Sequence, residues 1–150
     1  MSSASLLCLL VAGASLVVAS ANDYETEGRH RTKRNVIQLC RVINRYTGRS
    51  CLNYNNYGCF CGLRSKGSSP VDGVDKCCRE HDRCFASLKC RLLPFVTYSL
   101  DCSGKTCSCN GKKKTSCSYR SCRCDIQLGE CLSWATYNRE HKNHNTLRCR

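Results

Sequence analysis

The segment DKCCREHDRCF, residues Asp75–Phe85, holds three cysteines and an adjacent histidine–aspartate pair, His81 and Asp82. Such a cluster is compatible with a metal-binding knuckle, with part of a disulfide scaffold, or with a catalytic helix. The choice depends on the redox compartment of the protein, which the rest of the chain indicates.

The first 34 residues are typical of sequences that are removed during secretion. The apolar run LLCLLVAGASLVV is too short to span a bilayer, and the small residues Ala19, Ser20 and Ala21 follow it, so residues 1–21 are predicted to be a signal peptide. Residues 22–34 are polar and end in RTKR, which suits a furin-type protease. We interpret them as a propeptide, with a basic linker as the alternative. We therefore expect a secreted protein with one domain, residues 35–150.

The cysteine content favours disulfides over a metal. Of seventeen cysteines, only Cys8 lies in the predicted signal peptide, which leaves sixteen. That many cysteines in a short secreted chain predict up to eight disulfides. Zinc bound by Cys77, Cys78, His81 and Cys84 is disfavoured, because oxidation competes for the same sulfurs.

The net charge indicates anionic partners. The expected mature chain has 24 − 4 = 20 Lys and Arg and 11 − 3 = 8 Asp and Glu, a net charge of +12. Secretion favours acidic lipid or heparan-type polymers over nucleic acid. The alternative is that the charge only keeps the protein soluble.

Periodicity and turn residues predict three helices and a hairpin. Apolar spacing indicates a short helix from Asn35 to Tyr46, and a loop rich in Asn, Gly and Ser follows from Asn53 to Pro70. The other elements expected are a helix that begins after the N-cap Asp72 and ends near Cys90, a hairpin at 97–109, and a helix at 117–134.

Cysteine spacing predicts how the two longer helices pair. Cys77 and Cys84 are seven residues apart, as are Cys124 and Cys131, so each pair lies on one helix face. If the helices are antiparallel, Cys77 meets Cys131 and Cys84 meets Cys124. Two disulfides in register would then hold the helices side by side.

This pairing would bring a carboxylate to a histidine. His81 shares the face of Cys77 and Cys84, and Asp125 lies two residues from the position directly opposite it. A buried His–Asp pair fixes the imidazole tautomer. Asp82 points about 100° away around the helix, toward the loop that Cys78 can tether through Cys61. A carboxylate beside backbone carbonyls suits calcium rather than zinc.

Four motifs together resemble the secreted phospholipases A2, most closely the group I type of pancreatic juice and venoms without the pancreatic loop. They are YGCFCG (Tyr57–Gly62), PVDGVDKCCREHDRCF (Pro70–Phe85), CRCD (Cys122–Asp125) and YNREHKN (Tyr137–Asn143). The resemblance implies a mainly α, disulfide-rich fold. Its expected parts are a short N-terminal helix, a calcium loop, two long antiparallel disulfide-clamped helices and a small two-stranded β-wing.

The resemblance also implies an activity, namely calcium-dependent hydrolysis of the sn-2 ester of glycerophospholipids at membrane interfaces, which gives lysophospholipid and free fatty acid. His81 would be the general base and Asp125 would orient it, supported by Tyr98. Calcium would be bound by the Asp82 carboxylate and by carbonyls of Phe60, Gly62 and Arg64, and the Gly62 amide would help to stabilise the oxyanion.

Six disulfides carry over from the resemblance: Cys59–Cys149, Cys61–Cys78, Cys77–Cys131, Cys84–Cys124, Cys90–Cys117 and Cys109–Cys122. The four remaining cysteines are predicted to pair as Cys40–Cys51 and Cys102–Cys107. The second pair flanks a tight turn, which would place it cross-strand. Cys40–Cys102 with Cys51–Cys107 is the alternative.

The expected partner is an anionic phospholipid membrane, with no nucleic acid and a monomer as the default state. The residues expected to line or rim the lipid channel are Val36, Ile37, Leu39, Ile43, Leu52, Tyr54 and Leu63, although core packing is the alternative for several. Basic residues of the first helix and the calcium loop, Arg41, Arg45, Arg49, Arg64 and Lys66, should lie nearest its mouth. The run Lys112–Lys114 also contributes or is only a solvated turn.

The chain departs from the family pattern at several positions. Arg64 and Ser65 replace loop glycines, and the loop is about one residue longer, which predicts weaker calcium affinity because glycine alone reaches φ > 0 freely. Phe85 replaces a tyrosine, and Arg45 stands where the family has a cysteine. The altered loop leaves a second hypothesis open, a non-enzymatic relative that acts as a toxin or receptor ligand.

Overall fold

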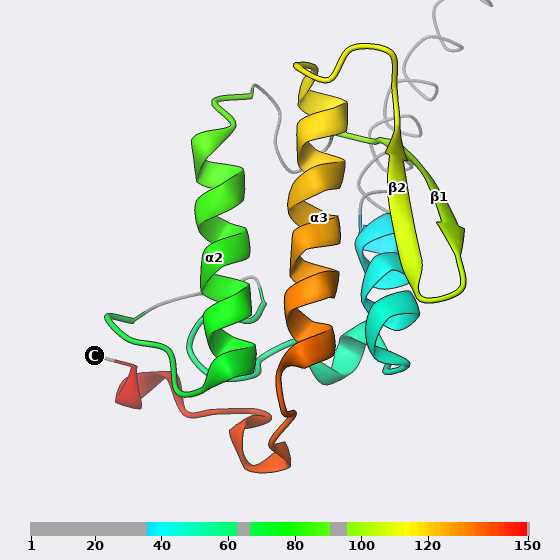
Figure 1. The fold of residues 1–150 in the computed structure, drawn as a ribbon. Coiled ribbons are helices and arrows are strands. Elements are labelled where there is room, and N and C mark those ends of the chain that lie inside the picture. The colour runs from blue at the N-terminus through cyan, green and yellow to red at the C-terminus, as the bar shows by residue number, and fades with distance from the viewer. Residues whose placement is uncertain (1–35, 63–66, 91–95, 150) are drawn as a thin grey trace, which may run out of the picture.

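The computed structural model describes residues 36–62, 67–90 and 96–149 (Figure 1). The predicted signal peptide and propeptide lie outside these ranges. Residues 36–47 are helical, and the later elements are η1 (Cys51–Asn53), α2 (Gly73–Ser87), β1 (Ser99–Ser103), β2 (Thr106–Asn110), α3 (Cys117–Trp134), η2 (Arg139–His141) and η3 (Thr146–Arg148). Among the described residues, none of the helices combines the length and apolarity that crossing a bilayer requires.

The long helices α2 and α3 lie side by side and form the centre of the fold, with the N-terminal helix and the β-wing on the other side of α3 (Figure 1). Cys77–Cys131 and Cys84–Cys124 join α2 to α3, each with a Cα–Cα distance of 5.7 Å. The predicted mainly α, disulfide-rich fold is therefore confirmed.

The ends of the long helices are set by capping and by one backbone angle. Asp72 caps α2 by accepting a hydrogen bond from the Asp75 amide, and Ser116 caps α3 in the same way through the Tyr119 amide. The predicted bounds of α3 are correct. The predicted end of α2 near Cys90 is wrong, because the helix stops at Ser87 and Lys89 adopts φ 48°, a left-handed conformation that cannot continue the helix.

The β-wing is an antiparallel hairpin in which Cys102 lies opposite Cys107. Gly104, with φ 56°, makes the turn. Alternate residues of both strands are exposed, and the other face packs on α3 through Leu100, Cys107 and Cys109. The wing thus covers the side of α3 that is away from α2.

Eight disulfides cross-link this small fold. The structure contains Cys40–Cys51 and Cys102–Cys107, with Cα–Cα distances of 4.9 and 4.0 Å, and not the alternative pairing. The six pairs implied by the resemblance are also present: Cys59–Cys149, Cys61–Cys78, Cys77–Cys131, Cys84–Cys124, Cys90–Cys117 and Cys109–Cys122.

Candidate active site

The centre of the candidate site is a hydrogen bond between the two long helices. The Nε2 atom of His81 on α2 lies 2.7 Å from Oδ1 of Asp125 on α3. The Asp125 side chain is 1% exposed and that of His81 is 15% exposed. Because a carboxylate oxygen only accepts hydrogen bonds, Nε2 is the donor, and Nδ1 of the neutral ring keeps its lone pair. The arrangement therefore presents a histidine whose free nitrogen can accept a proton.

A buried tyrosine holds the other oxygen of Asp125. The Tyr98 hydroxyl donates a hydrogen bond to Asp125 Oδ2. Burial first, and then the charge of Asp125, raise the pKa of Tyr98 well above its usual range, so its proton is retained. Both oxygens of the buried carboxylate consequently have a donor, and the carboxylate is fixed in position.

Phe85 occupies the position where the resemblance implies a second tyrosine. Its ring centroid lies 4.8 Å from that of His81, so it packs against the imidazole instead of donating to Asp125. Tyr98 is then the tyrosine whose hydroxyl donates to this carboxylate, and its supporting role in the reaction stays a prediction.

Asp75, fully buried near the start of α2, organises the loop beside this histidine. Its carboxylate accepts hydrogen bonds from the amides of Phe60, Cys59 and Val71 at 2.7, 2.9 and 3.0 Å. Gly58 makes room for it, because a Cβ added there would lie 2.3 Å from Asp75 Cγ. The loop backbone is therefore attached to the same helix that carries His81.

A second link brings the loop toward Asp82. The Cys61–Cys78 disulfide, with a Cα–Cα distance of 5.0 Å, attaches the residue between Phe60 and Gly62 to α2. Asp82 is exposed and lies four residues after Cys78, so it is on the same face of the helix. The loop carbonyls and the Asp82 carboxylate thus belong to one side of α2.

The backbone of Gly62 requires glycine. It has φ 121°, and an added Cβ would lie 3.0 Å from Asn55 Oδ1 and 3.1 Å from the Asn56 amide. Arg64, the third predicted carbonyl ligand, lies outside the described residues, together with Leu63, Ser65 and Lys66.

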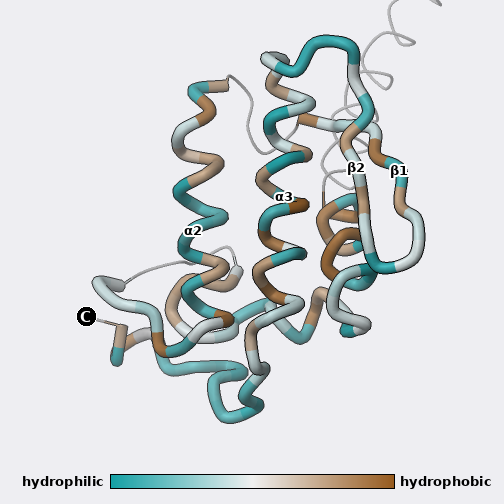
Figure 2. The backbone as a smooth tube through the Cα atoms, viewed as in Figure 1, coloured by the Kyte–Doolittle hydropathy of each residue, from teal (hydrophilic) through white to brown (hydrophobic). Residues whose placement is uncertain are grey.

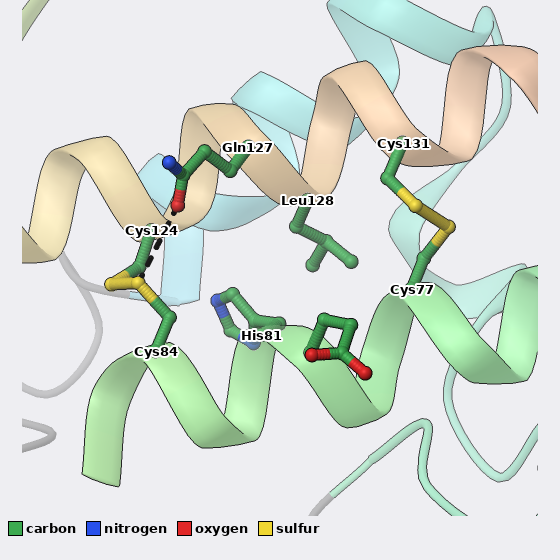
Figure 3. A pocket seen from close by; sticks show the side chains of 8 residues that line it. Cys77, His81, Cys84, Cys124, Gln127, Leu128 and Cys131 are labelled. Carbon is green, nitrogen blue, oxygen red and sulfur yellow. Dashed lines mark hydrogen bonds between the residues drawn. A yellow bond between two sulfur atoms is a disulfide. The ribbon is translucent and has the colours of Figure 1, made fainter. Parts of the chain in front are cut away.

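A pocket of about 60 Å³ opens between α2 and α3. Figure 3 shows the His81 imidazole in it, between the two disulfides that join the helices. Its other lining residues are Glu80, Gln127 and Leu128. The pocket is large enough for a few water molecules and too small for an acyl chain.

The residues predicted to line the lipid channel divide into two groups. Ile43 and Tyr54 belong to the buried core, and Leu39 packs against it, so core packing accounts for these three. Val36, Ile37 and Leu52 are large exposed apolar side chains, as a rim requires.

Two residues that position the site were not singled out from the sequence. In the sequence, Asp75 is an acidic residue in the first turn of α2, where acidic residues are common. Its spacing from Cys78, i to i+3, is the one local signal that it faces the loop. Gln38 on the N-terminal helix bonds both backbone groups of Tyr98: its Nε2 donates to the carbonyl, and its Oε1 accepts from the amide at 3.4 Å. Nothing local in the sequence indicates that pair.

A phospholipase A2 family profile matches residues 36–142. The chain belongs to the phospholipase A2 family. It is 40% identical over 106 residues to a phospholipase A2 of Ovis aries, covering 65% of this chain and 85% of the relative. It is 33% identical over 144 residues to a phospholipase A2 of Bos taurus, covering 91% and 96%.

A third relative is named differently. The chain is 40% identical over 109 residues to the neutral phospholipase A2 homolog taipoxin beta chain 2 of Oxyuranus scutellatus scutellatus, covering 71% of this chain and 87% of the relative. Membership in this phospholipase family supports hydrolysis of lipid esters as the class of activity, and the His81–Asp125 pair is the arrangement in this chain that suits it.

Replacing Tyr98 with phenylalanine should lower the free energy of unfolding by about 1–3 kcal/mol, because one oxygen of buried Asp125 loses its donor. Since the pKa of Tyr98 is raised, its contribution is fully present below about pH 10 and is lost only at higher pH. Thermal unfolding at neutral pH measures the effect. Tyr137→Phe, which removes a bond to the Asn53 carbonyl, is the control. An equal loss in both variants would contradict the prediction.

Replacing Asp75 with asparagine should destabilise the loop, because the amide NH₂ would face backbone N–H groups that the carboxylate now satisfies. Each N–H left without an acceptor lowers the unfolding free energy by about 1–3 kcal/mol. Asp101→Asn is the matched control, since Asp101 is exposed and accepts from Asn110. If denaturation of the two variants with disulfides intact gives the same midpoint, Asp75 does not have this role.

Proposed function

We propose that the protein is a secreted, calcium-dependent phospholipase A2 that hydrolyses the sn-2 ester of glycerophospholipids. The observation that carries the proposal is the hydrogen bond between His81 Nε2 and buried Asp125, which leaves Nδ1 as a proton acceptor. The enzyme would release a fatty acid and a lysophospholipid.

His81 would act as a general base on a water molecule. Nδ1 accepts the proton as the water oxygen attacks the ester carbonyl, and the imidazolium that forms is stabilised by Asp125, 2.7 Å from Nε2. Tyr98 holds the far oxygen of Asp125, which keeps the carboxylate aligned with the ring. The proton then returns from Nδ1 to the leaving alcohol, so no acyl-enzyme is required.

The donor set fits a hard cation such as calcium. A carboxylate, Asp82, and the carbonyls of Phe60 and Gly62 are oxygen ligands, and the Cys61–Cys78 disulfide supports their common location. Calcium would polarise the ester carbonyl and neutralise its developing negative charge. The Gly62 amide would donate a hydrogen bond to the same oxyanion. Arg64 would add a third carbonyl, and we expect weaker binding than with a glycine there.

The membrane contact would use the N-terminal helix and η1. Exposed Val36, Ile37 and Leu52 can enter a lipid surface, and Arg41 and Arg45 are exposed on the same helix as the first two. Basic residues near an acidic leaflet contribute about 1 kcal/mol each, which favours anionic over zwitterionic membranes.

A non-enzymatic role as a toxin or receptor ligand is the second candidate. One relative carries the word homolog in its name, which is the observation in its favour. Against it, the chain retains His81, Asp82 and Asp125 together, and a pure binding protein does not need this combination.

The decisive experiment measures fatty acid release from mixed phospholipid vesicles with calcium and with EGTA. We expect hydrolysis only with calcium, and we expect His81→Gln to abolish it because Gln has no basic nitrogen. Gln127→Ala, in the same pocket but without a predicted chemical role, is the control. Calcium-independent release, or more than a few per cent of activity in folded His81→Gln, would contradict the assignment.

Preference for anionic vesicles should weaken with salt, because surface attraction is screened within a Debye length. The variant R41Q/R45Q should bind acidic vesicles less tightly, whereas K76Q/R139Q removes the same charge elsewhere and should have a smaller effect. Sedimentation of vesicles with bound protein measures both. Equal binding of the wild-type protein to neutral and acidic vesicles at low salt would refute the preference.

A further inference from the structure

A buried hydroxyl one helix turn from the candidate base pair lacks a hydrogen-bond partner. Ser121 on α3 is fully buried, and within residues 36–62, 67–90 and 96–149 its Oγ bonds no donor or acceptor. Figure 2 shows α3 between α2 and the β-wing, with hydrophobic stretches along it. Native proteins rarely bury a polar group unless protein, water or a ligand satisfies it, so this hydroxyl requires an explanation.

The usual solution for a hydroxyl inside a helix is not used by Ser121. Serine and threonine side chains in helices commonly bond a carbonyl three or four residues earlier in the same helix. Ser121 makes no such bond in the part of the chain that the structure describes. Other helical hydroxyls of this protein do so, at 2.7, 2.7 and 2.6 Å: Thr47, Ser87 and Ser133.

Asp125 is a polar group within reach of Ser121 on the same helix. The two residues are four positions apart, which places them on one face and about 6 Å apart along the axis. That spacing is too long for a direct hydrogen bond and suits two successive bonds of about 2.8 Å through one water molecule. A carboxylate offers about four acceptor positions, and His81 and Tyr98 use two of those on Asp125.

The oxygen that the water would supply is one that this chain lacks. Phe85 stands where the resemblance implies a tyrosine, so a hydroxyl is absent beside Asp125. The Cys84–Cys124 disulfide joins α2 to α3 next to Phe85, and Ser121 lies one turn before Cys124. A water oxygen is about the size of the tyrosine oxygen that is absent, and it needs at least two polar partners, which Ser121 and Asp125 provide.

We propose that Ser121 is a positioning residue for the reaction, which binds Asp125 through one buried water in place of a tyrosine hydroxyl at Phe85. This inference rests on the proposed function, because it concerns the carboxylate that orients His81. The water accepts the hydrogen of the Ser121 hydroxyl and donates one of its own to Asp125. The carboxylate then has three donors, which restricts its rotation and that of the imidazole bonded to it.

The sign of a thermal shift tests this bridge without using activity. If the hydroxyl has no partner, Ser121→Ala removes a buried unsatisfied group and should raise the unfolding midpoint. If the hydroxyl holds a water on Asp125, the midpoint should fall by a few degrees, which is the result we expect. Ser133→Ala removes a hydroxyl bonded within α3 and is the matched control. An unchanged or raised midpoint for Ser121→Ala would overturn the proposal.

A second hydroxyl should make the bridge unnecessary. Phe85→Tyr adds a donor that can bond Asp125 directly. S121A should therefore lower kcat about tenfold in the wild-type background, with little change in KM, and should have almost no effect in the F85Y background. Fatty acid release from vesicles at saturating calcium gives the rates. Equal losses in both backgrounds would show that Ser121 acts only through packing and would overturn the proposal.

A crystal structure of the wild-type protein locates the water directly. A water should lie within about 3.2 Å of both Ser121 Oγ and an Asp125 oxygen. A Ser121 hydroxyl bonded to the Cys117 carbonyl, with no such water, would overturn the proposal even if F85Y failed to fold. A wild-type protein without hydrolysis would overturn the role in the reaction together with the proposed function. The thermal shift and the water position would then still show whether Ser121 is linked to Asp125.

Discussion

The two disulfides between α2 and α3 are the constraint on which the site depends. Each helix carries its cysteines seven residues apart, so forming both bonds fixes the register of one helix against the other as well as their separation. His81 lies between the two bonds on α2, and Asp125 lies next to Cys124 on α3. A slip by one residue would rotate one partner by about 100° and remove it from the shared face. The 2.7 Å hydrogen bond is therefore a consequence of covalent geometry.

The same helix that positions His81 also positions the loop beside it. Asp75 lies six residues before His81 on α2 and accepts three amides from two separate parts of the loop region. Cys78, three residues before His81, bonds Cys61 in the same loop. One helix thus carries the histidine, the carboxylate Asp82 and both attachments of the loop. Burying the Asp75 carboxylate is favourable only because three donors meet it, which makes the loop conformation and the burial mutually dependent.

Features that depend on helical periodicity could be predicted from the sequence. Features that depend on contacts with distant segments of the chain could not. The bounds of α3 and the two disulfides between the long helices follow from helical spacing, which the order of residues already contains. The end of α2 could not be predicted, because the left-handed backbone at Lys89 follows no propensity. The role of Asp75 depends on amides about fifteen residues earlier in the chain, and Gln38 reaches Tyr98 across sixty positions. No periodic pattern encodes such contacts. Most disulfides and the roles of the loop came from the family resemblance.

The β-wing and the N-terminal helix are linked here without the disulfide that the resemblance implies. Where the resemblance implies a cysteine near the end of the first helix, the chain has exposed Arg45, and Cys102 pairs across its own hairpin with Cys107. The neighbouring Tyr46 provides a noncovalent link, because its hydroxyl accepts from the Cys107 amide at 3.1 Å and lies 3.4 Å from Glu130 Oε1 on α3. Gly129 permits this approach, since a Cβ there would lie 2.7 Å from the Tyr46 ring.

A hydrogen bond of this kind contributes about 1 kcal/mol, less than a disulfide that closes a long loop. The N-terminal helix therefore depends more on Gln38, Cys40–Cys51 and its packing against α3 than on the wing. Because Gln38 also holds the backbone of Tyr98, the N-terminal helix is connected to the donor that fixes Asp125. A lipid surface in contact with this helix would thus be connected to the Asp125 carboxylate through two successive hydrogen bonds, Gln38 to Tyr98 and Tyr98 to Asp125.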